Sequence, residues 1–148
     1  MFKKLNKKGF TLAELLIVVA IIAVLVAISI PIFNSRLEAS RESVDASNLR
    51  AAYAVASADL LTEGYKDATK YTTNVGYYNV STGDVQKGKP EKACGKSQIA
   101  GFQGSTPDLP AGVTWTDGAA ATGKFIKVTI TPAAAGTNGS VTIEWEAE

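Results

Sequence analysis

The first third of the chain is dominated by one long apolar segment. Every residue from Leu15 to Ile28 is apolar, and the wider segment 10–33 is interrupted only by Thr11, Glu14, Ser29 and Pro31. As an α-helix, these 24 residues would extend about 36 Å at about 1.5 Å per residue, enough to cross a hydrocarbon core of about 30 Å. The pattern therefore predicts one membrane-spanning helix over residues 10–33.

The next segment, residues 34–63, keeps a helical period but becomes amphipathic. Its apolar stripe is predicted to consist of Leu37, Val44, Leu49, Tyr53, Val55, Ala56 and Leu60. The charged side chains are expected on the opposite side, either solvated or facing neighbouring molecules; they are Arg36, Glu38, Arg41, Glu42 and Asp45. The two segments together predict one helix from about Phe10 to Glu63.

The remainder of the chain shows the alternation of short strands. Residues 140–146 alternate well between apolar and polar, and residues 124–130 alternate imperfectly, with a loop or wide hairpin over 132–139. Further strands are predicted within 70–80 and over 112–116, the latter followed by an Asp117-Gly118 turn. A helix followed by a meander predicts an α+β fold, with the helix packed on a small antiparallel sheet of three or four strands.

Charge at the N-terminus sets the expected orientation. Four lysines, Lys3, Lys4, Lys7 and Lys8, precede the apolar segment, so the N-terminus is predicted to stay in the cytoplasm and the C-terminal part to lie outside. A secretory signal would be followed by a cleavage site of small residues. The sequence Ile30-Pro31-Ile32-Phe33 follows instead, so we expect the helix to be retained.

Composition argues against several classes of function. The chain has no histidine and one cysteine, Cys94, which rules out an internal disulfide, a Cys/His zinc set and a Ser-His or Cys-His nucleophile pair. Gly95-Lys96-Ser97 lacks the glycine that a phosphate-binding loop needs at position 90, which is proline. We therefore expect no enzyme activity, no metal and no cofactor.

Two charged clusters have simple surface interpretations. A basic cluster is formed by Lys87, Lys89, Lys92 and Lys96; it is interpreted as a solvated loop, the alternative being a docking patch for DNA, an anionic glycan or another subunit. The net charge of +1 argues against general nucleic-acid binding. Alternating carboxylates in the last strand are interpreted as an exposed face rather than a calcium site; they are Glu144, Glu146 and Glu148.

Glu14 is the unusual residue of the apolar segment. A carboxylate in a membrane helix is costly and commonly has a partner. Glu14 could simply lie at the level of the lipid headgroups, where the helix dipole favours a negative charge, or it could have a functional role. Position alone leaves both interpretations open.

The string Lys8-Gly9-Phe10-Thr11-Leu12-Ala13-Glu14-Leu15-Leu16 resembles the class III signal of type IV pilins and the related pseudopilins. The resemblance implies a leader over 1–9, a filament-core helix over 10–33 and a globular pilin domain over 34–148. It implies that prepilin peptidase cuts between Gly9 and Phe10 and methylates the new Phe10 amine. Glu14 would neutralise the Phe10 amine of a neighbouring subunit, and Pro31 would kink the helix.

The same resemblance implies a structural role. The chain would be a major subunit of a type IV pilus, a homopolymer assembled by a platform and ATPase machinery for adhesion, motility or surface contact. Its precursor would lie in the cytoplasmic membrane and the assembled pilus at the cell surface. One alternative is a pseudopilin of a type II secretion or DNA-uptake apparatus. Another is a monomeric, membrane-anchored adhesin or sensor.

Overall fold

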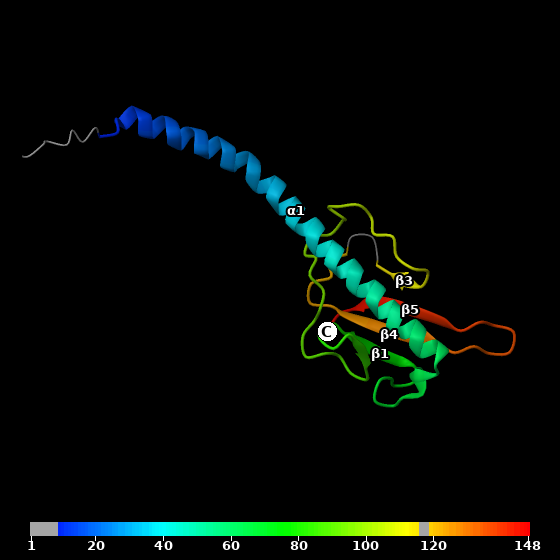
Figure 1. Cartoon of the computed structure of the whole chain (residues 1–148). Coiled ribbons are helices and arrows are strands. Elements are labelled where there is room, and N and C mark those ends of the chain that lie inside the picture. Colours follow the sequence, from blue (N-terminus) through cyan, green and yellow to red (C-terminus); the bar gives the residue numbers. More distant parts are fainter. Residues whose placement is uncertain (1–8, 116–118) are drawn as a thin grey trace, which may run out of the picture. The chain divides into compact units, whose positions relative to one another are not determined.

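The computed structural model describes residues 9–115 and 119–148. The leader lysines and the predicted Asp117-Gly118 turn lie outside the described residues. One helix, α1, runs from Leu12 to Leu61, which confirms the long helix expected from the hydrophobic pattern (Figure 1). The chain divides into two compact units at the junction of Ser35 and Arg36, and α1 contributes to both. The units are described separately below.

The second unit contains a five-stranded sheet with the order β2-β1-β4-β5-β3. Its strands are β1 (Val75–Asn79), β2 (Asp84–Gln86), β3 (Val113–Thr114), β4 (Phe125–Thr131) and β5 (Ser140–Glu146). The pairs β1–β2, β1–β4 and β4–β5 are antiparallel, whereas β3 runs parallel to β5. The α+β class is confirmed, but the expectation of three or four purely antiparallel strands is wrong, because the sheet has five strands and is mixed.

The two strands that changed the expected sheet are short edge strands. β2 has three residues and buries only Val85, and β3 has two residues. β2 shows too little alternation to be recognised from sequence, because its position depends on the strand beside it. β3 lies within a predicted strand, but it pairs parallel to β5 rather than antiparallel. The predicted strand at 112–116 is thus only partly realised, as β3.

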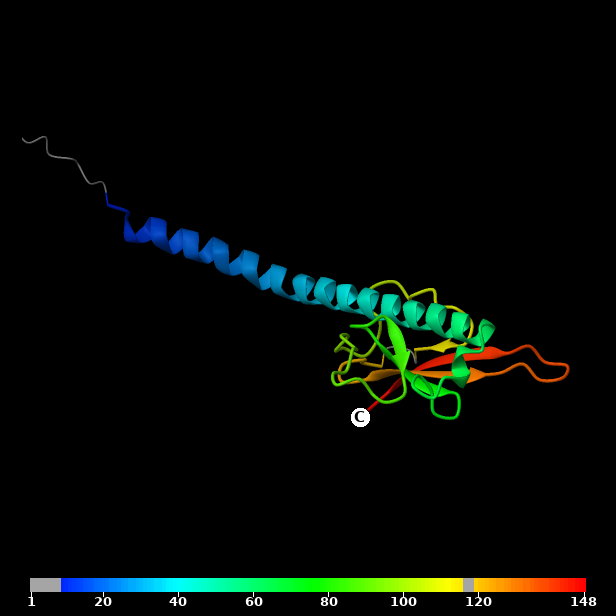
Figure 2. The same cartoon turned by 60° about the horizontal axis from the view of Figure 1, so that its bottom comes forward.

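The core forms on the side of the sheet that faces the second half of α1 (Figure 2). Alternate residues of β4 and β5 point into it: Ile126, Val128, Ile130, Val141 and Ile143, each no more than 6% exposed. Register places Val128 opposite Ile143 and Ile130 opposite Val141, so apolar pairs lie side by side across the two longest strands. The α1 residues of this core are Ala46, Leu49, Ala52 and Ala56.

The buried face of α1 differs from the predicted stripe. Leu37 and Val44 are exposed, whereas Glu38, Glu42 and Asp45 are buried. The predicted solvated or neighbour-facing position of these three carboxylates is therefore wrong. They face a loop of the same chain and accept hydrogen bonds from its backbone N–H groups, which removes the penalty for burying them.

The opposite face of the sheet carries a network of ion pairs. Lys127 Nζ lies 2.9 Å from Glu144 Oε1 and 3.3 Å from Glu146 Oε2. Glu146 also receives a hydrogen bond from the Tyr77 hydroxyl (2.9 Å) and pairs with Lys89 Nζ (3.2 Å). The final strand is therefore tied to β4, to β1 and to the loop after β2. Of the predicted basic cluster, Lys89 is engaged in this network rather than freely solvated.

Candidate functional site

In the first unit, the apolar side chains of the helix are not packed against other described parts of the chain. Apolar side chains from Leu12 to Phe33 are about half exposed or more, from 47% for Val26 to 80% for Leu12. The most apolar 18-residue stretch of this helix is not buried against any other described residue. By length and composition this segment can cross a membrane. So large an apolar surface requires either lipid or other protein around it.

The Gly9–Phe10 junction precedes the first turn of α1 and is exposed. Phe10 is 92% exposed, and neither residue belongs to a helix or strand. A Cβ built on Gly9 would meet no atom within 4 Å. The fold therefore does not require glycine at this position. A requirement for glycine here would come from a molecule that reads the junction from outside.

Glu14 forms a capping box with Thr11. The Thr11 backbone N–H and its hydroxyl both donate to Glu14 Oε2 at 2.7 Å, and the Glu14 N–H donates to Thr11 Oγ1 at 3.2 Å. This reciprocal arrangement satisfies N–H groups that the start of a helix leaves without partners. The sequence interpretation missed Thr11, although the threonine followed three residues later by glutamate is a readable capping signal.

The capping box bears on the two alternatives for Glu14. Both hydrogen bonds from Thr11 end on Oε2, which leaves Oε1 without a donor among the described residues. The nitrogen of Phe10 is a peptide nitrogen while the chain is uncut, so the ion pair expected from the resemblance would arise only after cleavage. In the uncut chain Glu14 is held within its own helix turn, close to the junction.

Pro31 lies within α1, and the helix is continuous on both sides of it. Proline has no N–H to donate to the carbonyl four residues earlier, so one helical hydrogen bond is missing there. Nearby, the Ser29 hydroxyl donates to the Leu25 carbonyl at 2.7 Å, which satisfies that polar group inside the apolar segment. The kink expected at Pro31 remains a prediction.

The structure thus places Gly9 and Phe10 shortly before α1 and Glu14 in its first turn, while Pro31 lies inside the same helix. Within residues 9–115 and 119–148, no group of three His, Cys, Asp or Glu side chains is placed to hold a metal ion. The features of this end are an exposed junction, a charged side chain at fixed spacing and an uncovered apolar helix. They suit recognition and assembly.

Comparison with known proteins gives one match. Residues 4–30 match the family model described as the prokaryotic N-terminal methylation motif. No curated protein and no solved structure matches the chain. The match spans the Gly9–Phe10 junction, the capping box and most of the apolar segment. The N-terminus of this chain is therefore a class III signal peptide of the type IV pilin-like kind.

Proposed function

We propose that this chain is the structural subunit of a type IV pilus, made as a membrane-anchored precursor and polymerised with copies of itself. The observation that carries the proposal is the methylation motif over residues 4–30, with its junction exposed immediately before an uncovered apolar helix. The apolar surface holds the precursor in the membrane. After processing, the same surface packs against the helices of other subunits.

Processing changes the charge at the start of the helix. Hydrolysis of the Gly9–Phe10 peptide bond adds water, leaving a carboxylate on Gly9 and an amine on Phe10. Methylation replaces one hydrogen of that amine with a methyl group from a donor bound by the peptidase, and the nitrogen stays cationic. A cation then begins the helix, four residues before the Glu14 carboxylate.

That cation and Glu14 give the assembly its register. In a bundle of apolar helices the dielectric is low, so opposite charges attract strongly while an unpaired charge is penalised. A new subunit is stabilised when its Phe10 amine meets the Glu14 of a neighbour. The packing of apolar side chains buries apolar surface between the subunits, and the charge pair selects one axial position of each helix.

A pseudopilin of a secretion or DNA-uptake apparatus is the second candidate, because the same motif serves both kinds of fibre. Labelling the C-terminal unit with an antibody and imaging intact cells separates the two. Long labelled surface filaments support the pilus. A short fibre confined to the envelope, needed for secretion or DNA uptake, supports the pseudopilin. Label spread over the membrane as monomers would overturn both and favour an anchored adhesin or sensor.

A further inference from the structure

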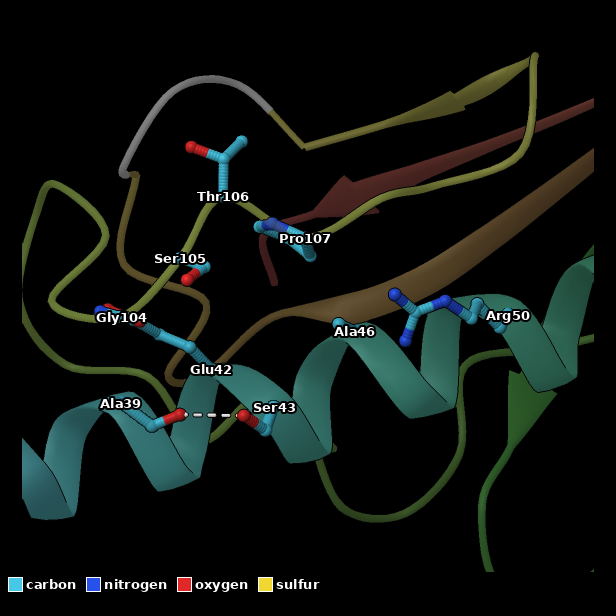
Figure 3. Close-up of a pocket in the computed structure, with 9 residues that line it drawn as sticks. All are labelled: Ala39, Glu42, Ser43, Ala46, Arg50, Gly104, Ser105, Thr106 and Pro107. Atoms are coloured by element: carbon cyan, nitrogen blue, oxygen red, sulfur yellow. Dashed lines mark hydrogen bonds between the residues drawn. The ribbon is translucent and has the colours of Figure 1, made fainter.

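One loop of the second unit is held by its backbone. We call residues 98–104 the strap. The Gln98 and Ile99 N–H groups donate to Glu38 Oε1, the latter at 2.9 Å. The Gln103 N–H donates to Glu42 Oε1 at 2.8 Å, and the Gly104 N–H to Glu42 Oε2 at 3.1 Å. Figure 3 shows the Glu42 side chain extending from α1 toward Gly104. Glu38 and Glu42 lie one helix turn apart, and their exposed fractions are 1% and 4%.

The residues just before the strap are anchored from two sides. Asp45 accepts the N–H groups of Lys96 (2.9 Å) and Ser97 (2.7 Å). The Ser97 carbonyl also accepts the Thr122 N–H at 2.9 Å, and the Ser97 hydroxyl accepts the Ala121 N–H at 3.1 Å. This anchor does not depend on α1 alone. The backbone of the strap, in contrast, is bound to α1 through Glu38 and Glu42.

Within the described part of the chain, the strap makes few side-chain contacts by comparison. Phe102 packs edge-on against Trp115, with 4.9 Å between ring centroids, and the Gln98 side chain accepts a hydrogen bond from Arg41. Ile99 is 47% exposed. No residue from Ser97 to Pro107 is charged. The strap therefore lies on the unit as an uncharged segment whose position is set mainly by two carboxylates.

We propose that Glu38 and Glu42 form a latch that holds the strap only while both are ionised. Neutralising them releases residues 98–104 as a local unit, while α1, the sheet and the Asp45 anchor stay folded. Release separates Phe102 from Trp115 and makes the strap backbone available to solvent. The fold thus contains a charge-controlled segment beside the first turns of the helix in this unit, a property that does not follow from the filament role.

The geometry explains why the charge is needed. Glu42 uses both oxygens as acceptors, and Glu38 gives one oxygen to two N–H groups and the other to Arg41 (3.1 Å). A protonated carboxyl carries a hydrogen on one oxygen, which would then face a donor instead of accepting from it. At least one buried N–H group or the Arg41 guanidinium would lose its partner. Buried donors without acceptors disfavour the closed arrangement.

Among the residues that the structure describes, the charged groups around the latch are few. On α1 they are Arg41, Asp45 and Arg50, the last bound through its guanidinium to the Asp108 carbonyl. Lys96 precedes the strap. Burial is the main cause of the raised pKa of the Cys94 thiol, and the nearby charge of Asp45 raises it as well. Burial disfavours ionisation of Glu38, but the N–H groups of Ile99 and Gln98 together with Arg41 outweigh it and lower its pKa below the ordinary 4.5. A lowered folded-state pKa means that the Glu38 half of the latch is closed at neutral pH and weakens as pH falls below that ordinary value.

The first test uses the full chain in detergent micelles at pH 7, with amide hydrogen exchange as the readout. Glu38→Gln/Glu42→Gln is compared with Glu63→Gln/Glu91→Gln, a control that removes two charges at exposed positions. We expect exchange in residues 98–104 to accelerate at least about tenfold, because one hydrogen bond to a charged group commonly corresponds to a tenfold or larger change in an equilibrium constant. Exchange in β4 and β5 should match the control. Unchanged exchange in the strap would overturn the proposal, as would an equal increase in β4 and β5.

The second test needs no variant. The chain contains two tryptophans, and Trp115 is the one that contacts the strap. On acidification below pH 4.5, we expect its fluorescence to change before the far-ultraviolet circular dichroism of helix and sheet does. In Phe102→Leu, which removes the ring contact, this early change should be smaller. A single transition in which both signals change together would contradict a local latch.

Discussion

At the residue scale, Glu14 has one observed role and one proposed role, and substitution can separate them. Within one chain it accepts both hydrogen bonds from Thr11 and so completes the first helical turn. In the proposed fibre it supplies the negative charge that a methylated Phe10 amine requires. The proposed cleavage would thus create a second partner for a carboxylate that already has one. The two roles depend on different properties, hydrogen-bond acceptance and charge.

Glu14→Gln should abolish or strongly reduce filament assembly, because glutamine can still complete a capping box but carries no charge. Thr11→Ala should have a smaller effect, since it removes the cap and leaves the charge. Filaments sheared from cells and quantified by immunoblot, relative to precursor in the membrane, provide the measurement. Equal assembly by Glu14→Gln and the wild-type chain would contradict the charge-pair role.

Gly9→Val should leave the fold unchanged and block processing. A Cβ at this position meets nothing within 4 Å, so the structure gives no reason for a change in melting temperature. A bulkier residue would instead disturb a peptidase that reads the junction. Electrophoretic comparison of precursor and mature chain in membranes checks this. A fully processed Gly9→Val chain would show that glycine is not read at the junction.

At the element scale, α1 is a helix with two different surroundings. In the first unit its side chains are exposed around the whole circumference, and in the second unit one face is buried against sheet and loop. The buried face contains small residues where it meets the sheet, Ala46, Ala52 and Ala56, and carboxylates where it meets the loop. Small side chains permit close approach, and the carboxylates replace apolar packing with hydrogen bonds to backbone.

Leu49→Ala should lower the free energy of unfolding by about 2–5 kcal/mol, because a fully buried leucine leaves a cavity when truncated. Leu37→Ala is the matched control. Leu37 is 40% exposed on the same helix, so its truncation should cost far less. Urea unfolding of the full chain in detergent, followed by tryptophan fluorescence, measures both. Similar losses for the two variants would favour the predicted stripe over the observed one.

Leu37 and Leu49 both belong to the predicted apolar stripe, but only Leu49 is buried. Sequence periodicity therefore predicts part of this fold and misses another part. The length of α1 and the strands β4 and β5 are recoverable, because periodicity is a local property of the chain. The inward direction of Glu38 and Glu42 is not, because their partners lie some 60 residues away and are backbone groups that any sequence possesses. At the candidate site, Gly9, Phe10 and Glu14 follow from a short string, and the Thr11 cap was readable there too.

At the scale of the whole molecule, ion pairs on the outer face of the sheet connect distant parts of the second unit. Glu146 near the C-terminus binds groups from β1, β4 and the loop after β2. Burial alone would raise its pKa, but Tyr77, Lys89 and Lys127 together lower it below the ordinary 4.5. Lys70 likewise lowers the pKa of Asp84 below its ordinary 3.8.

Stability should therefore fall as the pH drops below about 4.5. A carboxylate whose folded-state pKa is lowered contributes fully above its ordinary pKa and loses that contribution as pH falls through the folded value. Melting temperatures measured at intervals from pH 7 to pH 3 should decline mainly below pH 4.5. Glu146→Gln should melt lower than wild type at pH 7 and show a shallower decline. A wild-type melting temperature that stays constant down to pH 3 would contradict the network's contribution.

The central claim is that this chain is a precursor whose leader is removed to make a polymer subunit. Intact mass and N-terminal peptide mass spectrometry of the chain purified from its own cells test it most directly. We predict a mature chain that begins at Phe10 and carries one additional methyl group on its amine. A functional chain that still begins at Met1 would contradict it.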